Sequence, residues 1–196
     1  MMADTGLLRW GRAMGRRRRD RLPVLWLFTD TRRLADPRPS VRRLPIGLAG
    51  VVLRHDDHPD RAAIGRDVAR ICRQRRLALV VAGDSRLAAS LGAGVHLRGG
   101  HWPSVLRPRG LVTSSAHDPI QLRRARRNGA DLAFLSPAFP TASHPGEGAL
   151  GPARWSDMVR RAGLPVAALG GIDGRSVRRL RFCRMAAAIG ALAADR

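Results

Sequence analysis

The sequence has 196 residues, of which 44% are hydrophobic, enough for one domain with a sizeable core. It contains no apolar run of about 18 residues, which excludes a membrane-spanning helix. The formal net charge of +21 comes from 36 basic residues that are all arginine and are spread along the chain. We expect this charge to attract phosphorylated small molecules, and we do not expect nucleic-acid binding to be the primary function.

The chain begins with a basic stretch that includes the run Arg16–Arg19. The apolar segment that follows is too short for the core of a signal peptide. We therefore expect residues 1–22 to form a loose, disordered basic tail and residues 23–196 to form a single domain. Cys72 and Cys183 stand alone without a CxxC pattern, which predicts buried, reduced thiols in a cytoplasmic protein.

Short apolar runs of strand length alternate with segments that have helix signals. The predicted strands are Val24–Asp30, Gly50–Arg54, Leu77–Ala82, Gly94–Leu97, Leu111–Ser115, Leu132–Leu135, Pro165–Leu169 and Met185–Ile189. The predicted helices are Pro59–Arg76, Ser85–Leu91, Asp118–Asn128, Arg154–Ala162 and Asp173–Phe182, whereas Thr31–Gly47 is rich in Pro and Arg and predicts a short or irregular connection. Eight strands with seven crossovers follow from this order.

This alternation predicts a compact α/β fold, the (β/α)8 TIM barrel. An open, doubly wound sheet is the alternative, but no GxGxxG pattern follows the first strand. The sequence ends at Arg196, almost directly after the eighth predicted strand. We therefore expect a short or missing final helix, which would leave one side of the barrel exposed or covered by a partner; a homo-oligomer is one such arrangement.

Small residues follow the last two predicted strands, where barrels often bind phosphate. Strand seven ends in Gly170–Gly171 with a helix predicted directly after it, and strand eight ends in Ile189–Gly190. Glycine lets backbone N–H groups approach an anion, and the start of a helix adds partial positive charge. After strand six, Thr141, Ser143 and His144 add two hydroxyls and an imidazole. Together these residues predict a phosphate site.

Two other strand ends carry groups suited to chemistry. Strand five ends in Ser115 and His117, a hydroxyl that can bond an anion and an imidazole that can exchange protons near neutral pH. Arg54, at the end of strand two, could hold a phosphate with two parallel hydrogen bonds. The alternative interpretation is that His117 belongs to an ordinary turn and that Arg54 is one more surface arginine.

Taken in order, these strand ends resemble the thiamine phosphate synthase/TenI family over roughly residues 24–192. The motifs are Thr29–Asp30, Leu53–Arg54, Gly94–Val95–His96–Leu97, Ser115–Ala116–His117, Gly129 to Thr141 and Gly170–Gly171–Ile172. The resemblance implies the same barrel. It also implies an enzyme that joins hydroxymethylpyrimidine diphosphate to a thiazole phosphate with magnesium and releases pyrophosphate.

By this resemblance, Thr141, Ser143, Gly170, Gly171, Ile189 and Gly190 would hold the thiazole phosphate, and Arg54 and Ser115 would contact the pyrimidine diphosphate. Magnesium is expected on the same ground, with Asp84 as the candidate ligand. The family's Asn-Asp pair after strand three falls on Ala82–Gly83, and residues 97–101 carry no carboxylate where the family has a second metal-binding Asp.

His144 stands where the family has Lys in the loop after strand six. We therefore expect the half of the site that binds diphosphate and magnesium to have diverged. Two alternatives to the synthase stay open. One is a TenI-like thiazole tautomerase with His117 as the proton-transfer group, and the other is a non-catalytic paralogue that binds a phosphorylated ligand.

Overall fold

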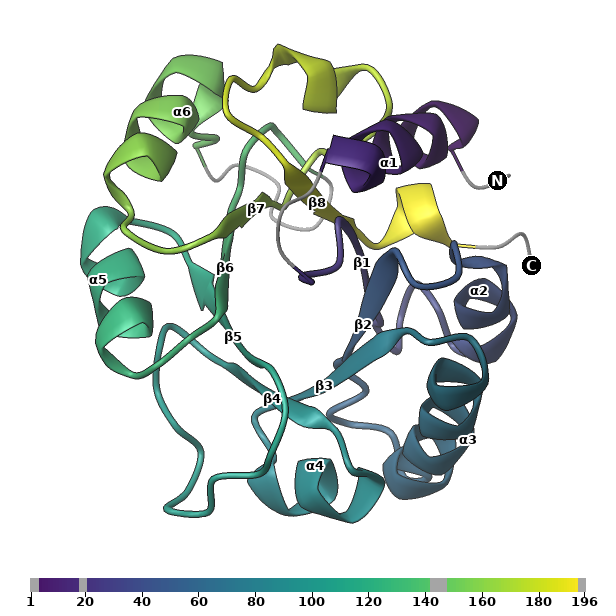
Figure 1. Cartoon of the computed structure of the whole chain (residues 1–196). Helices are drawn as coiled ribbons and strands as arrows, with labels where there is room; N and C mark the ends of the chain where they lie inside the picture. Colours follow the sequence, from purple (N-terminus) through teal and green to yellow (C-terminus); the bar gives the residue numbers. More distant parts are fainter. Residues whose placement is uncertain (1–3, 18–20, 142–147, 194–196) are drawn as a thin grey trace.

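Eight parallel strands close into a barrel in the computed structural model, which describes residues 4–17, 21–141 and 148–193 (Figure 1). The strands pair in sequence order, and β1 pairs with β8 to complete the ring. Their bounds are Leu25–Phe28 (β1), Ala49–Leu53 (β2), Ala78–Ala82 (β3), Gly94–Leu97 (β4), Val112–Ala116 (β5), Leu132–Leu135 (β6), Val166–Ala168 (β7) and Met185–Ala188 (β8). The predicted TIM barrel is confirmed, and the open sheet is excluded.

Large and small side chains alternate around the barrel interior. Trp26 and Phe28 of β1 meet Phe134 of β6 edge to face, with ring centroids 5.4 and 4.8 Å apart. Gly50 on the neighbouring strand makes room for them, because a Cβ there would lie 2.6 Å from the Trp26 ring. The interior is therefore a packed core.

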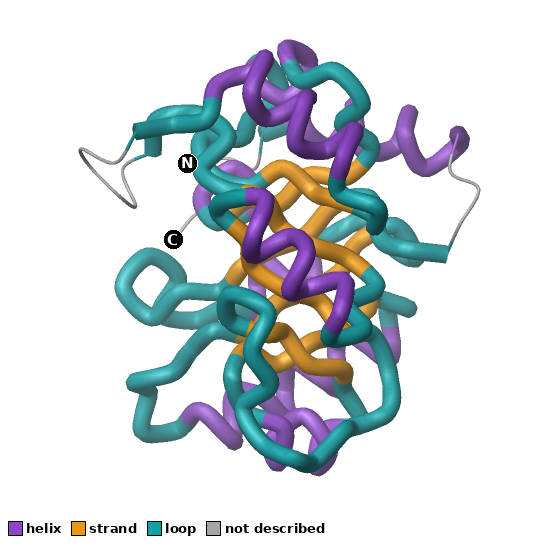
Figure 2. The backbone as a smooth tube through the Cα atoms, turned by 90° about the vertical axis from the view of Figure 1, so that its left-hand side faces the viewer, coloured by secondary structure: helices purple, strands orange, loops and turns teal. Residues whose placement is uncertain are grey.

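Helices and loops surround the strands (Figure 2). The helices are Thr5–Arg17 (α1), Arg38–Arg43 (α2), Arg61–Gln74 (α3), Ser85–Leu91 (α4), Pro119–Arg127 (α5) and Gly151–Arg161 (α6), with 3₁₀ turns at Ser176–Arg179 (η1) and Gly190–Leu192 (η2). The long helix predicted over Asp173–Phe182 is thus wrong: only η1 forms. The start of α1 packs directly on this segment, so that a Cβ on Gly174 would lie 2.6 Å from the backbone of Gly6 and Leu7.

The predicted loose N-terminal tail is wrong for the described residues, because α1 is a helix docked on the barrel (Figure 1). Asp4 caps it by accepting hydrogen bonds from the N–H groups of Gly6 and Leu7, at 2.7 and 3.1 Å. Leu7 and Trp10 are buried in the core. Their spacing of three residues is the sequence signal that indicates this helix.

α1 lies along the outside of β8 and β1, where the sequence predicts a short or missing final helix. Its start is tied to Ala191 by the Asp4 N–H, at 2.9 Å, and its Gly11 packs on Leu25 of β1. Within the described residues, β8 is followed only by the short turn η2. The first helix of the chain therefore covers the side of the barrel at which the last strand meets the first.

The predicted buried, reduced cysteines are confirmed. Cys72 and Cys183 are both buried free thiols, and burial raises the pKa of each to about 12. Among the described helices, none is long and apolar enough to cross a membrane.

Candidate active site

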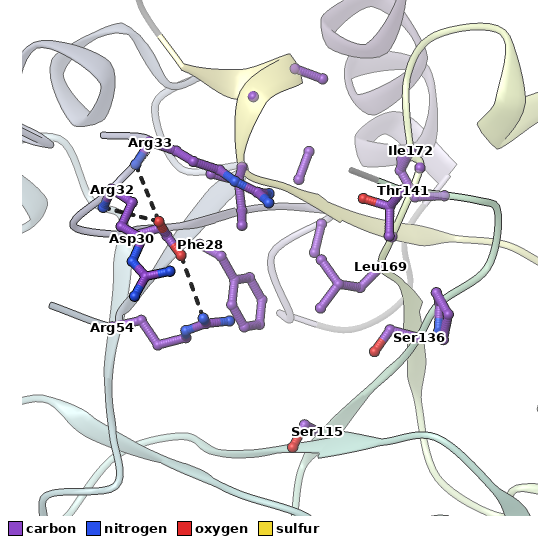
Figure 3. A pocket seen from close by; sticks show the side chains of 18 of the residues that line it. Phe28, Asp30, Arg32, Arg33, Arg54, Ser115, Ser136, Thr141, Leu169 and Ile172 are labelled. Atoms are coloured by element: carbon purple, nitrogen blue, oxygen red, sulfur yellow. Dashed lines mark hydrogen bonds and ion pairs between the residues drawn. The ribbon is translucent and has the colours of Figure 1, made fainter. Parts of the chain in front are cut away.

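A cavity of about 900 Å³ opens where the strands end, lined by residues that follow almost every strand. This volume lies within the range of small-molecule sites, and the carboxyl ends of the strands are where barrel enzymes bind their ligands. Figure 3 shows two unlike sides: Asp30, Arg32, Arg33 and Arg54 gather on one, whereas Thr141, Leu169 and Ile172 lie on the other. In the view, Ser115 lies below and between these two groups of residues, and Ser136 lies below Leu169.

On the arginine side, Asp30 organises the loop after β1. One carboxylate oxygen accepts the N–H groups of Arg32 and Arg33, at 3.1 and 3.2 Å, and the other pairs with Nη2 of Arg54 at 3.5 Å (Figure 3). The backbone N–H of Arg54 donates to Thr29 Oγ1 at 2.8 Å. Asp30 and Thr29 therefore fix both ends of Arg54, while its guanidinium stays open to the cavity.

A second network connects the loops after β2, β3 and β4. Asp56 pairs through one oxygen with Arg61, at 3.1 Å, and through the other with Arg98. Arg61 also donates to Asp84 at 3.2 Å and to the carbonyl of Ala82 at 2.7 Å. Arg98 and Asp56 line the cavity, whereas Arg61 and Asp84 lie behind them.

Two buried histidines support this side of the cavity. His96 of β4 lies at the cavity floor, and its Nδ1 is 2.9 Å from Thr113 Oγ1. Burial, together with the positive charges of Arg54 and Arg98, lowers its pKa to about 3, so the imidazole is neutral. His55 is also fully buried, between Thr29 and the carbonyl of Leu34, and burial lowers its pKa too.

On the opposite side, the two glycines after β7 approach the loop after β6 closely. A Cβ on Gly170 would lie 2.9 Å from the Pro137 Cα, and one on Gly171 would lie 2.6 Å from the Pro140 carbonyl. Both have positive φ, 87° and 63°, which favours glycine on its own. Gly190 differs, because a Cβ added there would meet no described atom within 4 Å apart from its neighbours in the chain.

Ser115 and His117 line the cavity between these two sides. Ser115 Oγ accepts the N–H of Gly99 at 2.9 Å and so holds the loop after β4. His117 Nδ1 lies 2.8 Å from the carbonyl oxygen of Ser136, which can only accept a hydrogen bond. Nδ1 therefore donates this hydrogen bond.

The structure brings together most of the side chains and glycines that the sequence singles out. Those that line the cavity are Arg54, Ser115, His117, Thr141, Gly170, Gly171, Ile189 and Gly190. Ser143 and His144 lie outside the described residues. The partial charge expected from a helix after β7 is reduced, because that helix is only the short turn η1.

Asp84, the candidate magnesium ligand, does not line the cavity. Its Oδ1 accepts the N–H of Leu87 at 2.9 Å and caps α4, and its Oδ2 pairs with Arg61. In the part of the chain that the structure describes, no three His, Cys, Asp or Glu side chains are arranged to hold a metal ion. The described residues therefore do not fit the magnesium site that the family resemblance implies.

Sequence analysis missed several cavity residues, among them Arg32, Arg33, Asp56 and His96. His96 carries a usable signal, a lone polar residue in the otherwise apolar strand β4. Arg32 and Arg33 carry none, because nothing in the sequence distinguishes them from the other arginines of the chain.

Comparisons with known proteins agree with one another. A family model described as thiamine monophosphate synthase matches residues 29–192. A protein of Aquifex aeolicus named putative thiamine-phosphate synthase 2 is 30% identical over 166 residues, which cover 80% of this chain and 89% of that protein. The thiamine-phosphate synthase of Parasynechococcus marenigrum is 31% identical over 189 residues, 91% of this chain but 54% of that longer protein.

Among solved structures, thiamine phosphate pyrophosphorylase from Pyrococcus furiosus superposes with a TM-score of 0.73 at 25% identity, with 85% of each chain covered. The family match over residues 29–192 includes all the described cavity-lining residues except Phe28.

Proposed function

Because the chain belongs to the thiamine monophosphate synthase family, we propose that it acts in thiamine biosynthesis, in the cytoplasm, and couples hydroxymethylpyrimidine diphosphate with thiazole phosphate. The observation that carries this proposal is the two-sided cavity. One side presents guanidinium groups suited to a diphosphate, and the other presents glycines and a hydroxyl suited to a single phosphate.

The thiazole phosphate would lie against Thr141 and the glycines after β7 and β8. In the described residues, the N–H groups of Gly170 and Gly171 donate to no protein acceptor, so both are available to an anion. Gly190 adds open space beside them. Backbone N–H groups fixed by a tight loop bind phosphate without reorganisation.

The pyrimidine diphosphate would lie on the arginine side, with Arg54 on its phosphates. In the reaction, the bond between the pyrimidine methylene carbon and the diphosphate oxygen breaks, and the diphosphate leaves with the electron pair. A bond from the thiazole nitrogen to that carbon forms. The residues that neutralise the departing diphosphate lower the barrier most, because negative charge develops there.

A second function has one observation in its favour. His117 lines the cavity with its Nδ1 bonded to the Ser136 carbonyl, which leaves Nε2 as the ring atom for a proton transfer in a thiazole tautomerase. Such an isomerisation needs neither a diphosphate nor a divalent cation. It predicts turnover of the thiazole alone, lost in His117→Ala and without pyrophosphate release.

A steady-state assay of pyrophosphate release with both substrates tests the synthase. We expect Gly190→Asp to raise the KM for thiazole phosphate by about tenfold or more, because a carboxylate would enter the open space beside the phosphate. Ala153→Asp places the same charge on the exposed face of α6 and should leave KM unchanged.

Two results would decide against the synthase. Release of pyrophosphate that needs no thiazole phosphate would exclude the coupling reaction. Inactivity with both substrates, together with intact phosphate binding, would identify a non-catalytic paralogue. Gly190→Asp is preferred to a change at Gly170, where any side chain would collide with Pro137 and disturb the loop.

A further inference from the structure

The loops after β3 and β4 meet at Gly83 and Arg98, at the edge of the arginine side. The ideal Cβ position of Gly83 lies 2.9 Å from Nε and 3.1 Å from Cζ of Arg98, so the guanidinium fills the space that a side chain at residue 83 would take. We propose that Arg98, together with Arg54, neutralises the diphosphate in this cavity, and that the diphosphate binds without a divalent cation. This inference rests on the proposed function only for the identity of the ligand.

The backbone that carries Arg98 is fixed before any ligand arrives. Ser115 Oγ accepts the N–H of Gly99, Arg124 donates to the Gly99 carbonyl at 3.2 Å, and Asn128 donates to the Gly100 carbonyl at 2.7 Å. Asp56 holds the guanidinium from the side. A cation held in this way loses little conformational entropy when it binds an anion.

The carboxylates around the arginine side are already engaged by other groups. Both oxygens of Asp84 are used, one by the α4 cap and one by Arg61. Asp56 pairs with Arg61 and Arg98, and Asp30 with Arg54 and two backbone N–H groups. Asp57 also lines the cavity but is exposed. A magnesium ion that bound both carboxylate oxygens of Asp30, Asp56 or Asp84 would have to displace an arginine.

Arg54 and Arg98 reach the same region of the cavity from different strands. Both line it, and both act on the same buried imidazole, His96. Their side chains are 41% and 58% exposed, so each keeps N–H groups free for a ligand while Asp30 or Asp56 holds it. Arg61, at 18%, is enclosed by its acids and acts as the support. Two guanidinium groups that line the same cavity suit the paired phosphates of a diphosphate.

Calorimetric titration of the full chain with inorganic pyrophosphate tests the inference without catalysis. We expect binding in the presence of a chelator, and saturating magnesium should tighten it by less than about twofold. Arg98→Ala and Arg54→Ala should each weaken it by roughly tenfold or more, the loss expected for a charge-assisted hydrogen-bonded pair. Arg123→Ala removes the same charge from the exposed face of α5 and should leave the affinity unchanged.

The variant Asp56→Asn distinguishes two roles of Asp56, support of Arg98 and binding of a metal ion. The amide oxygen can still accept from Arg98, so pyrophosphate binding in chelator should persist in this variant. A requirement for magnesium in the wild type, or an unchanged affinity in Arg98→Ala, would overturn the inference.

The coupling assay keeps the two proposals apart. Magnesium-independent pyrophosphate binding without coupling would overturn only the proposed function. Coupling together with pyrophosphate binding that needs magnesium would overturn only the inference that arginines bind the diphosphate without a divalent cation.

Discussion

Single polar residues inside the apolar barrel decide the electrostatics of the site. His96 is 2% exposed, and its ring centroid lies 5.4 Å from that of Phe28 and 5.6 Å from that of Phe134. An imidazolium there would lose its hydration and face two guanidinium groups, so the neutral ring is strongly favoured. A neutral imidazole at the cavity floor offers a hydrogen bond to a heterocycle without adding charge.

The lowered pKa of His96 predicts how stability depends on pH. The unfolded chain binds a proton at His96 below about pH 6.5, whereas the native chain does so only below about pH 3. The free energy of unfolding should therefore fall as pH drops from 6.5 towards 3, by up to about 1.4 kcal/mol per pH unit for this residue. Urea unfolding at pH 7, 6 and 5 measures the slope.

Two variants test which residue causes this pH dependence of the free energy of unfolding. His96→Asn should reduce the pH dependence. Part of it should remain, because burial lowers the pKa of His55 too. Arg123→Ala, at an exposed position on α5, should leave it as in the wild type, because an arginine stays charged over this pH range. A wild-type His96 that titrates near pH 6.5 by NMR would contradict the environment described for it.

Among the elements, α1 covers the place where β8 meets β1. It runs from the carboxyl end of β8, at Ala191, to the amino end of β2, where Gly15 contacts Leu48. This is the direction of a helix that follows β8 in a barrel. Residues far apart in sequence therefore complete one layer, and the start of α1 also packs on the segment after β7, which forms only a 3₁₀ turn.

If α1 belongs to the core, truncating its buried face should destabilise the whole barrel. We expect Leu7→Ala to lower the free energy of unfolding by about 2–5 kcal/mol, since Leu7 is fully buried. Arg9→Ala, on the exposed face of the same helix, should change it by less than about 0.5 kcal/mol. Equal unfolding midpoints for the two variants in urea would show that α1 does not contribute to the fold.

At the scale of the whole molecule, charge and fold act together. The net charge of +21 produces an attractive field for anionic ligands, and the cavity lies where both predicted phosphate groups would enter. Bidentate arginine contacts act only at short range, whereas this field acts over about 10 Å at 0.1 M salt. The field therefore affects the association rate more than the bound geometry.

Salt should slow the capture of charged ligands. Raising the ionic strength from about 0.05 to 0.5 M should lower the association rate constant of pyrophosphate by up to about tenfold, because screening shortens the range of the field. Stopped-flow measurements give this rate, with the unphosphorylated thiazole alcohol as the uncharged control. Equal salt dependence for both ligands would contradict steering by the net charge.

The sequence by itself determined the barrel, its strands and the cavity residues at the ends of strands two, five, seven and eight. Apolar periodicity and glycine positions are local properties, and each strand that they predict is present to within about two residues. The helix α5 was predicted equally well, because Asp118 caps it at the predicted start. Asp84, expected as a magnesium ligand, caps α4 instead.

Only the tertiary structure decided which arginines and acids meet. Asp56, Arg61, Asp84 and Arg98 come from four separate segments, and their ion pairs depend on distances through space that no sequence spacing encodes. In a chain with 36 arginines, composition could not single out Arg98. The barrel does so, because it brings the loops after β3 and β4 together and leaves room for that guanidinium above Gly83.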